Sequence, residues 1–155
     1  MTDREEQYKQ LVRQLLALLE GEHAYMAVLA NTAAALRDMF GERFFWVGFY
    51  MVSEGELVLG PFQGPVACMH IARGKGVCGT CWGQEQTIVV PDVEQFRGHI
   101  ACSSESRSEI VVPIKNRGEV KGVIDIDSRS LNAFDAIDAR YLEQIADIVA
   151  LQLYD

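Results

Sequence analysis

The sequence predicts an α+β domain built on a central antiparallel sheet, with helices from both ends of the chain on one face and an irregular, pocket-forming insert on the other. Helical spacing of apolar residues occurs near the two ends of the chain, and strand patterns with hairpin turns occupy the middle. Grouped strands flanked by helices are typical of this fold class. The 155 residues fit one domain, which we expect to span residues 1–155.

Two helices are predicted before the first strand. Thr2 and Glu5 have the spacing of a capping box, and apolar residues follow at helical intervals. Gly21 can end this first helix. The second helix is expected over about 23–40, and Gly41 ends it.

Strands with two hairpin signals follow, and a last helix closes the chain. An irregular insert covers 60–86, with one short helix after Gly79, and a polar irregular stretch covers 92–108. Asp135 caps the final helix, on which we expect Asp138 to be a surface charge. The predicted strands cover residues 43–52, 57–59, 87–90, 110–114 and 120–126.

Composition excludes several classes of function. Fourteen Lys and Arg against 22 Asp and Glu give a net charge of −8, which argues against nucleic acid and anionic membranes as partners. No apolar run approaches the about 18 residues of a membrane span. The first residues lack a basic head followed by an apolar stretch, so we expect a cytoplasmic protein without a secretory signal. Its four cysteines are then expected to be buried, catalytic or metal-bound rather than to form structural disulfides.

The first predicted strand has an unusual pattern of aromatic residues. Because side chains alternate along a strand, Gly48 falls between Trp46 and Tyr50 on one face, and we expect the gap to leave a concave apolar patch. Ordinary packing in a second layer is the alternative. The opposite face is expected to be core beneath the helices, and its members are Phe45, Val47, Phe49 and Met51.

Acidic residues mark a second candidate site. Asp125 and Asp127 point the same way from a strand whose isoleucines face the core, and Glu109 begins the neighbouring hairpin strand. A solvated sheet edge would explain them without a function. Alternatively, the carboxylates bind an ammonium group, or one of them has a raised pKa and keeps a proton that it can donate.

The cysteines allow three interpretations. Cys78 and Cys81 form a Cys-x-x-Cys pair, which resembles a thioredoxin-type motif but lies in a glycine-rich loop rather than a βαβ unit. Together with His99 and Cys102 the pair also has nearly the spacing of a zinc site, although a chain with its own core does not need one. The third interpretation is thiol redox chemistry on a small molecule, because Cys68, Cys78 and Cys102 all lie in irregular segments.

Five segments together resemble a known family, the free methionine-(R)-sulfoxide reductases, which are single GAF domains. The likeness extends along nearly the whole chain, and its three cysteine motifs are highly specific. It implies a GAF-like fold and thiol-dependent reduction of free L-methionine-(R)-sulfoxide. The segments are 60–68 (GPFQGPVAC), 74–80 (GKGVCGT), 98–102 (GHIAC), 108–113 (SEIVVP) and 122–128 (GVIDIDS).

The resemblance also implies roles for individual residues. Cys102 would attack the sulfoxide sulfur and become a sulfenic acid, Cys68 would resolve it as a disulfide, and Cys78 would be a third, less essential redox thiol. Trp46 and Tyr50 would hold the methyl end of the substrate. The sulfoxide oxygen and the amino group would be bound by Glu109, Asp125 and Asp127.

The same resemblance implies no bound cofactor and no metal, with recycling by thioredoxin and NADPH as the external reductant. The amphipathic first and last helices allow a homodimer. Cys81 departs from the family pattern and leaves the disulfide pairing open, since it is close enough in sequence to bridge to Cys78. The alternatives are a ligand-sensing GAF module without catalysis, a zinc-stabilised interaction domain, and a bilin-carrying GAF domain attached through Cys102.

Overall fold

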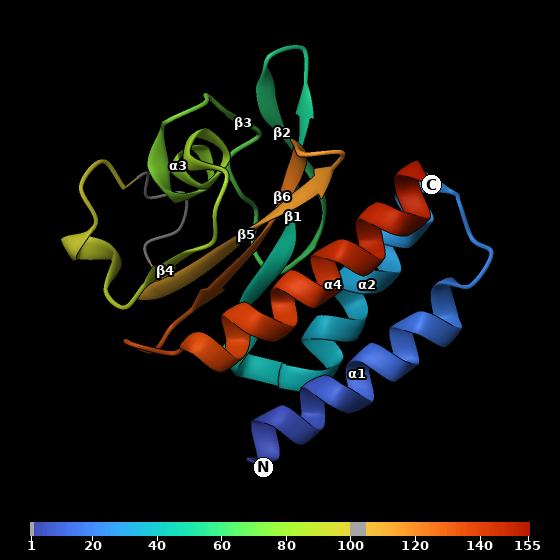
Figure 1. The fold of residues 1–155 in the computed structure, drawn as a ribbon. Coiled ribbons are helices and arrows are strands. Elements are labelled where there is room, and N and C mark those ends of the chain that lie inside the picture. Colours follow the sequence, from blue (N-terminus) through green and yellow to red (C-terminus); the bar gives the residue numbers. More distant parts are fainter. Residues whose placement is uncertain (1, 100–104) are drawn as a thin grey trace.

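One antiparallel sheet of six strands organises the molecule, in the order β3-β2-β1-β6-β5-β4 (Figure 1). This computed structural model describes residues 2–99 and 105–155. Every strand pairing is antiparallel, so the predicted α+β fold class is confirmed. The strands are β1 (Trp46–Ser53), β2 (Glu56–Gln63), β3 (His70–Ile71), β4 (Ile88–Val90), β5 (Ser108–Asn116) and β6 (Glu119–Ser128).

The helices divide between the two faces of the sheet. The three long helices α1, α2 and α4 gather on one face, and the short α3 lies on the other (Figure 1). Contacts join α2 and α4 to the sheet, and α1 packs against both of these helices. No helix in the described part of the chain is long and apolar enough to cross a membrane. Their bounds are α1 (Asp3–Leu19), α2 (Tyr25–Phe40), α3 (Gly76–Gln84) and α4 (Ala136–Tyr154), with 3-10 turns at Gly41–Phe44 and Val93–Gln95.

Local signals in the sequence explain where these helices begin and end. The Thr2 hydroxyl accepts a hydrogen bond from the Glu5 backbone N–H at 3.1 Å, and both halves of a capping box are present at Asp135. Gly41 ends α2 with a φ of 58°, a conformation that suits glycine. Each cap satisfies N–H or C=O groups that a helix end leaves without a partner.

The two faces of the sheet build two separate cores. Val47, Phe49, Ile124 and Ile126 pack with the long helices in the first core. The second core lies beneath α3 and contains Trp46, Tyr50 and Val111, among others. The two side-chain orientations predicted for β6 are therefore confirmed, with its isoleucines toward the helices and its aspartates on the other face.

The predicted start of the first strand was wrong. Residues 41–44 form a 3-10 turn, and β1 begins only at Trp46. Phe45 has helical backbone angles, so it does not take part in the alternation along the strand. Its ring consequently packs with Trp46 and Tyr50 in the second core instead of beneath the helices.

The segment predicted as an irregular insert contains more regular structure than expected. Strand β2 continues to Gln63, and α3 begins at Gly76 rather than after Gly79. Pro61 had suggested a loop, but the β1–β2 register shifts between Gly48 and Tyr50, at this level of the hairpin. A strand tolerates proline at such a bulge, where its missing N–H leaves no ladder bond broken.

Asp138 is not a surface charge. Its side chain is fully buried and accepts hydrogen bonds from Tyr8 at 2.6 Å and Arg43 at 2.9 Å. Arg4 lies 3.3 Å away, and the Asp135 backbone N–H donates to the same carboxylate. The helical pattern predicted the position on α4 but not these partners, which come from α1 and from the 3-10 turn after α2.

Candidate functional site

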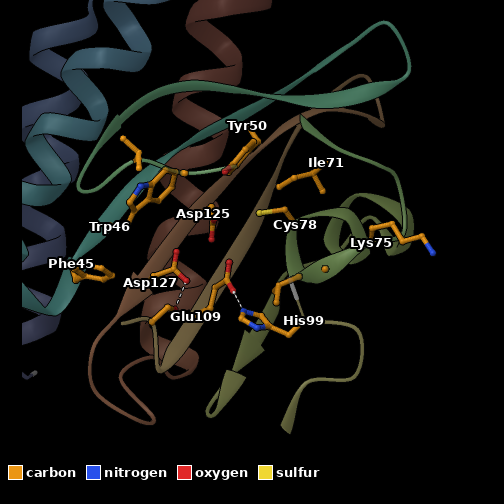
Figure 2. A pocket seen from close by; sticks show the side chains of 15 residues that line it. Phe45, Trp46, Tyr50, Ile71, Lys75, Cys78, His99, Glu109, Asp125 and Asp127 are labelled. Atoms are coloured by element: carbon orange, nitrogen blue, oxygen red, sulfur yellow. Dashed lines mark hydrogen bonds and ion pairs between the residues drawn. The ribbon is translucent and has the colours of Figure 1, made fainter. Parts of the chain in front are cut away.

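A pocket opens on the face of the sheet opposite the long helices, between the strands, α3 and the loop that follows β2 (Figure 2). Its empty space amounts to about 560 Å³, a figure that includes solvent at the open mouth. The residues along its walls are aromatic, acidic and sulfur-bearing. Among them are Phe45, Trp46, Tyr50, Ala67, Lys75, Cys78, His99, Ser106, Glu109, Asp125 and Asp127.

Strand register brings the three predicted acidic residues together. Glu109 on β5 pairs directly with Asp127 on β6, and Asp125 lies two residues along the same face. Because β6 is a central strand of the sheet, these residues do not lie on a solvated edge. Glu109 and Asp125 are only 6% and 5% exposed. Figure 2 shows the three carboxyl groups pointing into the same space.

Burial makes these carboxyl groups hold protons at pH values where an exposed acid is ionised. The pKa of Glu109 is raised well above its ordinary value, first by burial and then by the charges of Asp125 and Asp127. The pKa of Asp127 is also raised well above its ordinary value by burial and by Asp125, although the Ser106 hydroxyl, which donates to it at 2.7 Å, opposes this. Glu109 and Asp127 are therefore the candidate proton donors.

Asp125 is the candidate for the group that keeps its charge. Its pKa is also raised by burial, but hydrogen bonds from Glu109 and the Cys78 thiol and the proximity of His99 oppose this, so it is raised less than those of Glu109 and Asp127. Its Oδ1 atom is buried and has no hydrogen-bond partner in the structure. A buried carboxylate oxygen without a partner is costly, so this atom is suited to receive a donor from a bound molecule.

Cys78 and His99 complete the polar wall. Cys78 projects from α3 toward Asp125 and Tyr50, and burial together with the charge of Asp125 raises its pKa well above that of a free thiol (Figure 2). The His99 Nε2 atom lies 3.7 Å from a carboxyl oxygen of Glu109. Burial lowers the pKa of His99. Both groups are therefore neutral at pH 7, and the negative charge of the wall comes from the carboxyl groups.

The aromatic wall differs from the prediction in one respect. Trp46 and Tyr50 both line the pocket, with ring centroids 6.0 Å apart, but Gly48 does not leave an open gap between them. Phe62 of β2 stacks on Trp46 at 5.2 Å, and a Cβ atom at Gly48 would overlap Phe62 and lie 2.8 Å from Trp46 Cη2. The missing side chain allows the two rings to pack closely, so the concave surface is made by the ring faces.

The four cysteines differ in their states and positions. Cys68 is disulfide-bonded, whereas Cys78 and Cys81 are free thiols on α3 and do not bridge to each other. Cys81 is fully buried, is not among the lining residues, and has its pKa raised to about 12, mainly by burial. Cys102, the predicted nucleophile, lies outside the described residues.

The predicted zinc spacing does not correspond to a group of close ligands in residues 2–99 and 105–155. Three residues there have ligand atoms within 4.8 Å of one another, namely Cys78, Glu109 and Asp125. Cys81 and His99, which the spacing would require, do not belong to this group. The Cys-x-x-Cys pair instead occupies two different environments on one helix.

Sequence reasoning missed two polar residues of the pocket. Ser106 lies in the polar stretch before β5 and reaches Asp127 by a hydrogen bond. His99 was considered only as a zinc ligand, yet it faces Glu109. Neither position has a periodic signal, because both precede a strand in irregular chain. Their proximity to an acidic strand was the available hint.

Comparison with known proteins places these features in a family. The family model described as the GAF domain matches residues 22–153. GAF domain-containing protein A of Dictyostelium discoideum is 57% identical over 94% of this chain and 92% of its own length. Free methionine-R-sulfoxide reductase of Escherichia coli strain K12 is 44% identical over 89% of this chain and 83% of its own. The crystal structure of free methionine-R-sulfoxide reductase from Neisseria meningitidis, in complex with its substrate, superposes with a TM-score of 0.94 at 47% identity, covering 98% and 91% of the two chains.

Proposed function

This chain belongs to the GAF domain family, in the group that includes the free methionine-R-sulfoxide reductases, and we propose that it reduces free L-methionine-(R)-sulfoxide to methionine. The observation that supports this activity most directly is the pocket itself. Buried carboxyl groups, an aromatic wall and a thiol converge on one concave space. The substrate has matching parts, namely an ammonium and a carboxylate group, a polar S=O bond and an apolar methyl group.

We propose that the pocket binds both charged ends of the free amino acid. The partnerless Oδ1 of Asp125 is suited to the ammonium group. Backbone N–H groups in the first turn of α3, which begins at Gly76, are available for the carboxylate, since a helix N-terminus attracts anions. Trp46 and Tyr50 offer apolar ring faces to the methyl end. A peptide-bound methionine lacks the free charges and should be rejected.

In the proposed chemical step, an acid activates the sulfoxide. Glu109 or Asp127 donates a hydrogen bond or its proton to the sulfoxide oxygen. General acid catalysis of this kind raises the reaction rate by about 10²–10⁴-fold. The sulfur of Cys102 attacks the substrate sulfur, the oxygen passes to the cysteine, and the products are methionine and a sulfenic acid. The raised pKa values of both acids support this assignment, because each holds its proton to a higher pH than an exposed carboxyl group does.

We propose that Cys68 then resolves the sulfenic acid. Cys78 and Cys81 are thiols in the structure while Cys68 is disulfide-bonded, and Cys102 is the remaining cysteine of the sequence. The Cys68 sulfur would bond to the Cys102 sulfur as the S–O bond breaks, and the oxygen leaves as water. Cys78, with its raised pKa, would remain a reserve thiol that reacts more slowly.

Recycling requires a dithiol reductant, for which we propose thioredoxin supplied by NADPH, without a cofactor bound to the chain itself. Such a system fits the cytoplasmic location expected from the sequence. We also propose a homodimer through the helical face, supported by exposed Leu16 and Leu18 on α1 and Leu151 on α4.

The experiment that tests the proposed activity follows NADPH consumption with thioredoxin and thioredoxin reductase. Three substrates are compared, namely free L-methionine-(R)-sulfoxide, its (S) epimer and a peptide-bound (R)-sulfoxide. We expect turnover with the free (R) form alone. Similar rates with all three would refute the pocket as described, and saturable binding without turnover would favour a ligand-sensing module.

A further inference from the structure

Two aromatic residues of the pocket are hydrogen-bonded to the loop that carries Cys68. The Trp46 indole N–H donates to the carbonyl oxygen of Pro65 at 2.9 Å. The Tyr50 hydroxyl donates to the carbonyl oxygen of Cys68 itself at 2.8 Å. The loop thus has one anchor near its beginning and a second on the redox residue.

Both anchors are rigid. Trp46 and Tyr50 lie on β1, a central strand, and are only 4% and 2% exposed. The loop that they hold is exposed at Val66 (87%) and Met69 (69%), whereas Ala67 and Cys68 pack against the second core. Where side chains of a loop face solvent, its hydrogen bonds contribute more to holding it in one position.

Gly64 allows the loop to approach the first anchor. Its φ of 136° lies in a region that favours glycine, and a Cβ atom there would be 2.7 Å from Trp46 Cδ1. The backbone at Gly64 therefore lies against the Cδ1 edge of the indole and the main chain at Trp46. This contact brings the carbonyl of Pro65 within reach of the Trp46 N–H.

We infer that Trp46 and Tyr50 are positioning residues for the resolving cysteine, and that Tyr50 does this through its hydrogen bond to Cys68. The inference rests on the proposed function, because it concerns the step in which Cys68 captures the sulfenic acid. In that step the thiol sulfur is oxidised, the sulfenic sulfur is reduced, and one water is released. The hydrogen bond and the disulfide restrict the same loop, so each lowers the entropy cost of forming the other.

The same two rings line the substrate pocket, which links the two half-reactions physically. Displacing Tyr50 toward or away from a bound molecule moves the group that holds Cys68. We therefore expect the rate at which Cys68 captures the sulfenic acid to depend on the position of the Tyr50 ring as well as on the loop.

The test is a single turnover without external reductant. Reduced protein is mixed with free L-methionine-(R)-sulfoxide and a diketone that traps sulfenic acids. The methionine formed and the trapped adduct are then measured together. In Tyr50→Phe, which keeps the ring, we expect about two- to tenfold more adduct per methionine than in wild type, corresponding to the loss of one hydrogen bond. Cys68→Ser, which lacks the resolving thiol, gives the highest ratio of adduct to methionine that the loss of this step can produce.

Tyr141→Phe is the matched control, because the Tyr141 hydroxyl is buried without a hydrogen-bond partner. Its adduct ratio should equal that of wild type. A second measurement needs no substrate: in glutathione buffers, the equilibrium constant for the Cys68 disulfide should fall about two- to tenfold in Tyr50→Phe and stay unchanged in Tyr141→Phe.

Unchanged adduct ratio and unchanged equilibrium constant in Tyr50→Phe would overturn the positioning role. A wild-type chain that forms no methionine would overturn the proposed function instead, and the glutathione measurement would still decide the role of Tyr50.

Discussion

The two faces of β6 have opposite chemistry, one apolar and one acidic. Ile124 and Ile126 pack against the long helices in an apolar core. Asp125 and Asp127, one residue away in each case, lie in the acidic pocket. The helical face is optimised for burial and contributes stability. The pocket face keeps buried carboxyl groups whose desolvation costs stability, and such groups persist where they serve a reaction.

The strongest test of the pocket face is Asp127→Asn. We expect turnover to fall by about 10²–10⁴ because a candidate acid is lost, while the amide can still accept the hydrogen bond from Ser106. Steady-state kinetics with free (R)-sulfoxide measures the effect. Asp147→Asn on the exposed side of α4 is the control, since Asp138 is buried and unsuitable. Equal turnover in both variants would exclude Asp127 as the acid and leave Glu109 as the remaining candidate.

The converse test is made on the helical face. Ile126→Ala removes a fully buried side chain, and we expect it to lower the free energy of unfolding by about 2–5 kcal/mol. Turnover at a temperature where the variant stays folded should remain near the wild-type value. Urea unfolding followed by circular dichroism gives the stability. A stable variant with strongly reduced turnover would show that the two faces are not separable.

Gly48→Ala tests the close packing of the aromatic wall. The added methyl group overlaps Phe62 and approaches Trp46, so we expect a loss of about 1–3 kcal/mol in the free energy of unfolding. KM for the sulfoxide should also rise, because the ring faces are displaced. Gly83→Ala is the control, because Gly83 also lacks a positive φ but a Cβ atom there meets nothing closer than 3.8 Å. A stability unchanged from wild type would contradict the packing at Gly48.

The buried acids of the pocket face should also make the free energy of unfolding depend on pH, which is the smallest of the expected effects. A carboxyl group whose pKa is raised on folding contributes its full stability below its unfolded pKa of about 4, and loses it as pH rises through the raised folded pKa. Glu109 and Asp127 behave in this way. In urea titrations at successive pH values, Asp127→Asn should therefore become more stable relative to wild type as the pH rises above 4. Parallel curves would contradict the raised pKa of Asp127.

The sequence predicted the alternation on β6 because a strand has a strict period of two, and this places Asp125 and Asp127 on the same face. The same rule failed at Phe45, since a 3-10 turn precedes β1 and no periodic signal marks it. Pro61 and the glycines of the insert concealed the length of β2, because proline at a bulge looks like a loop signal. The ion pairs of Asp138 and the loop anchors of Tyr50 are long-range contacts between segments that local patterns do not relate.

The central claim is that Cys102 is the thiol that takes the oxygen of free methionine sulfoxide. Methionine released per chain is measured after reduced protein is mixed with excess free (R)-sulfoxide in the absence of any reductant. The account predicts close to one methionine per wild-type chain and none from a folded Cys102→Ser variant. Equal yields from both proteins would contradict it.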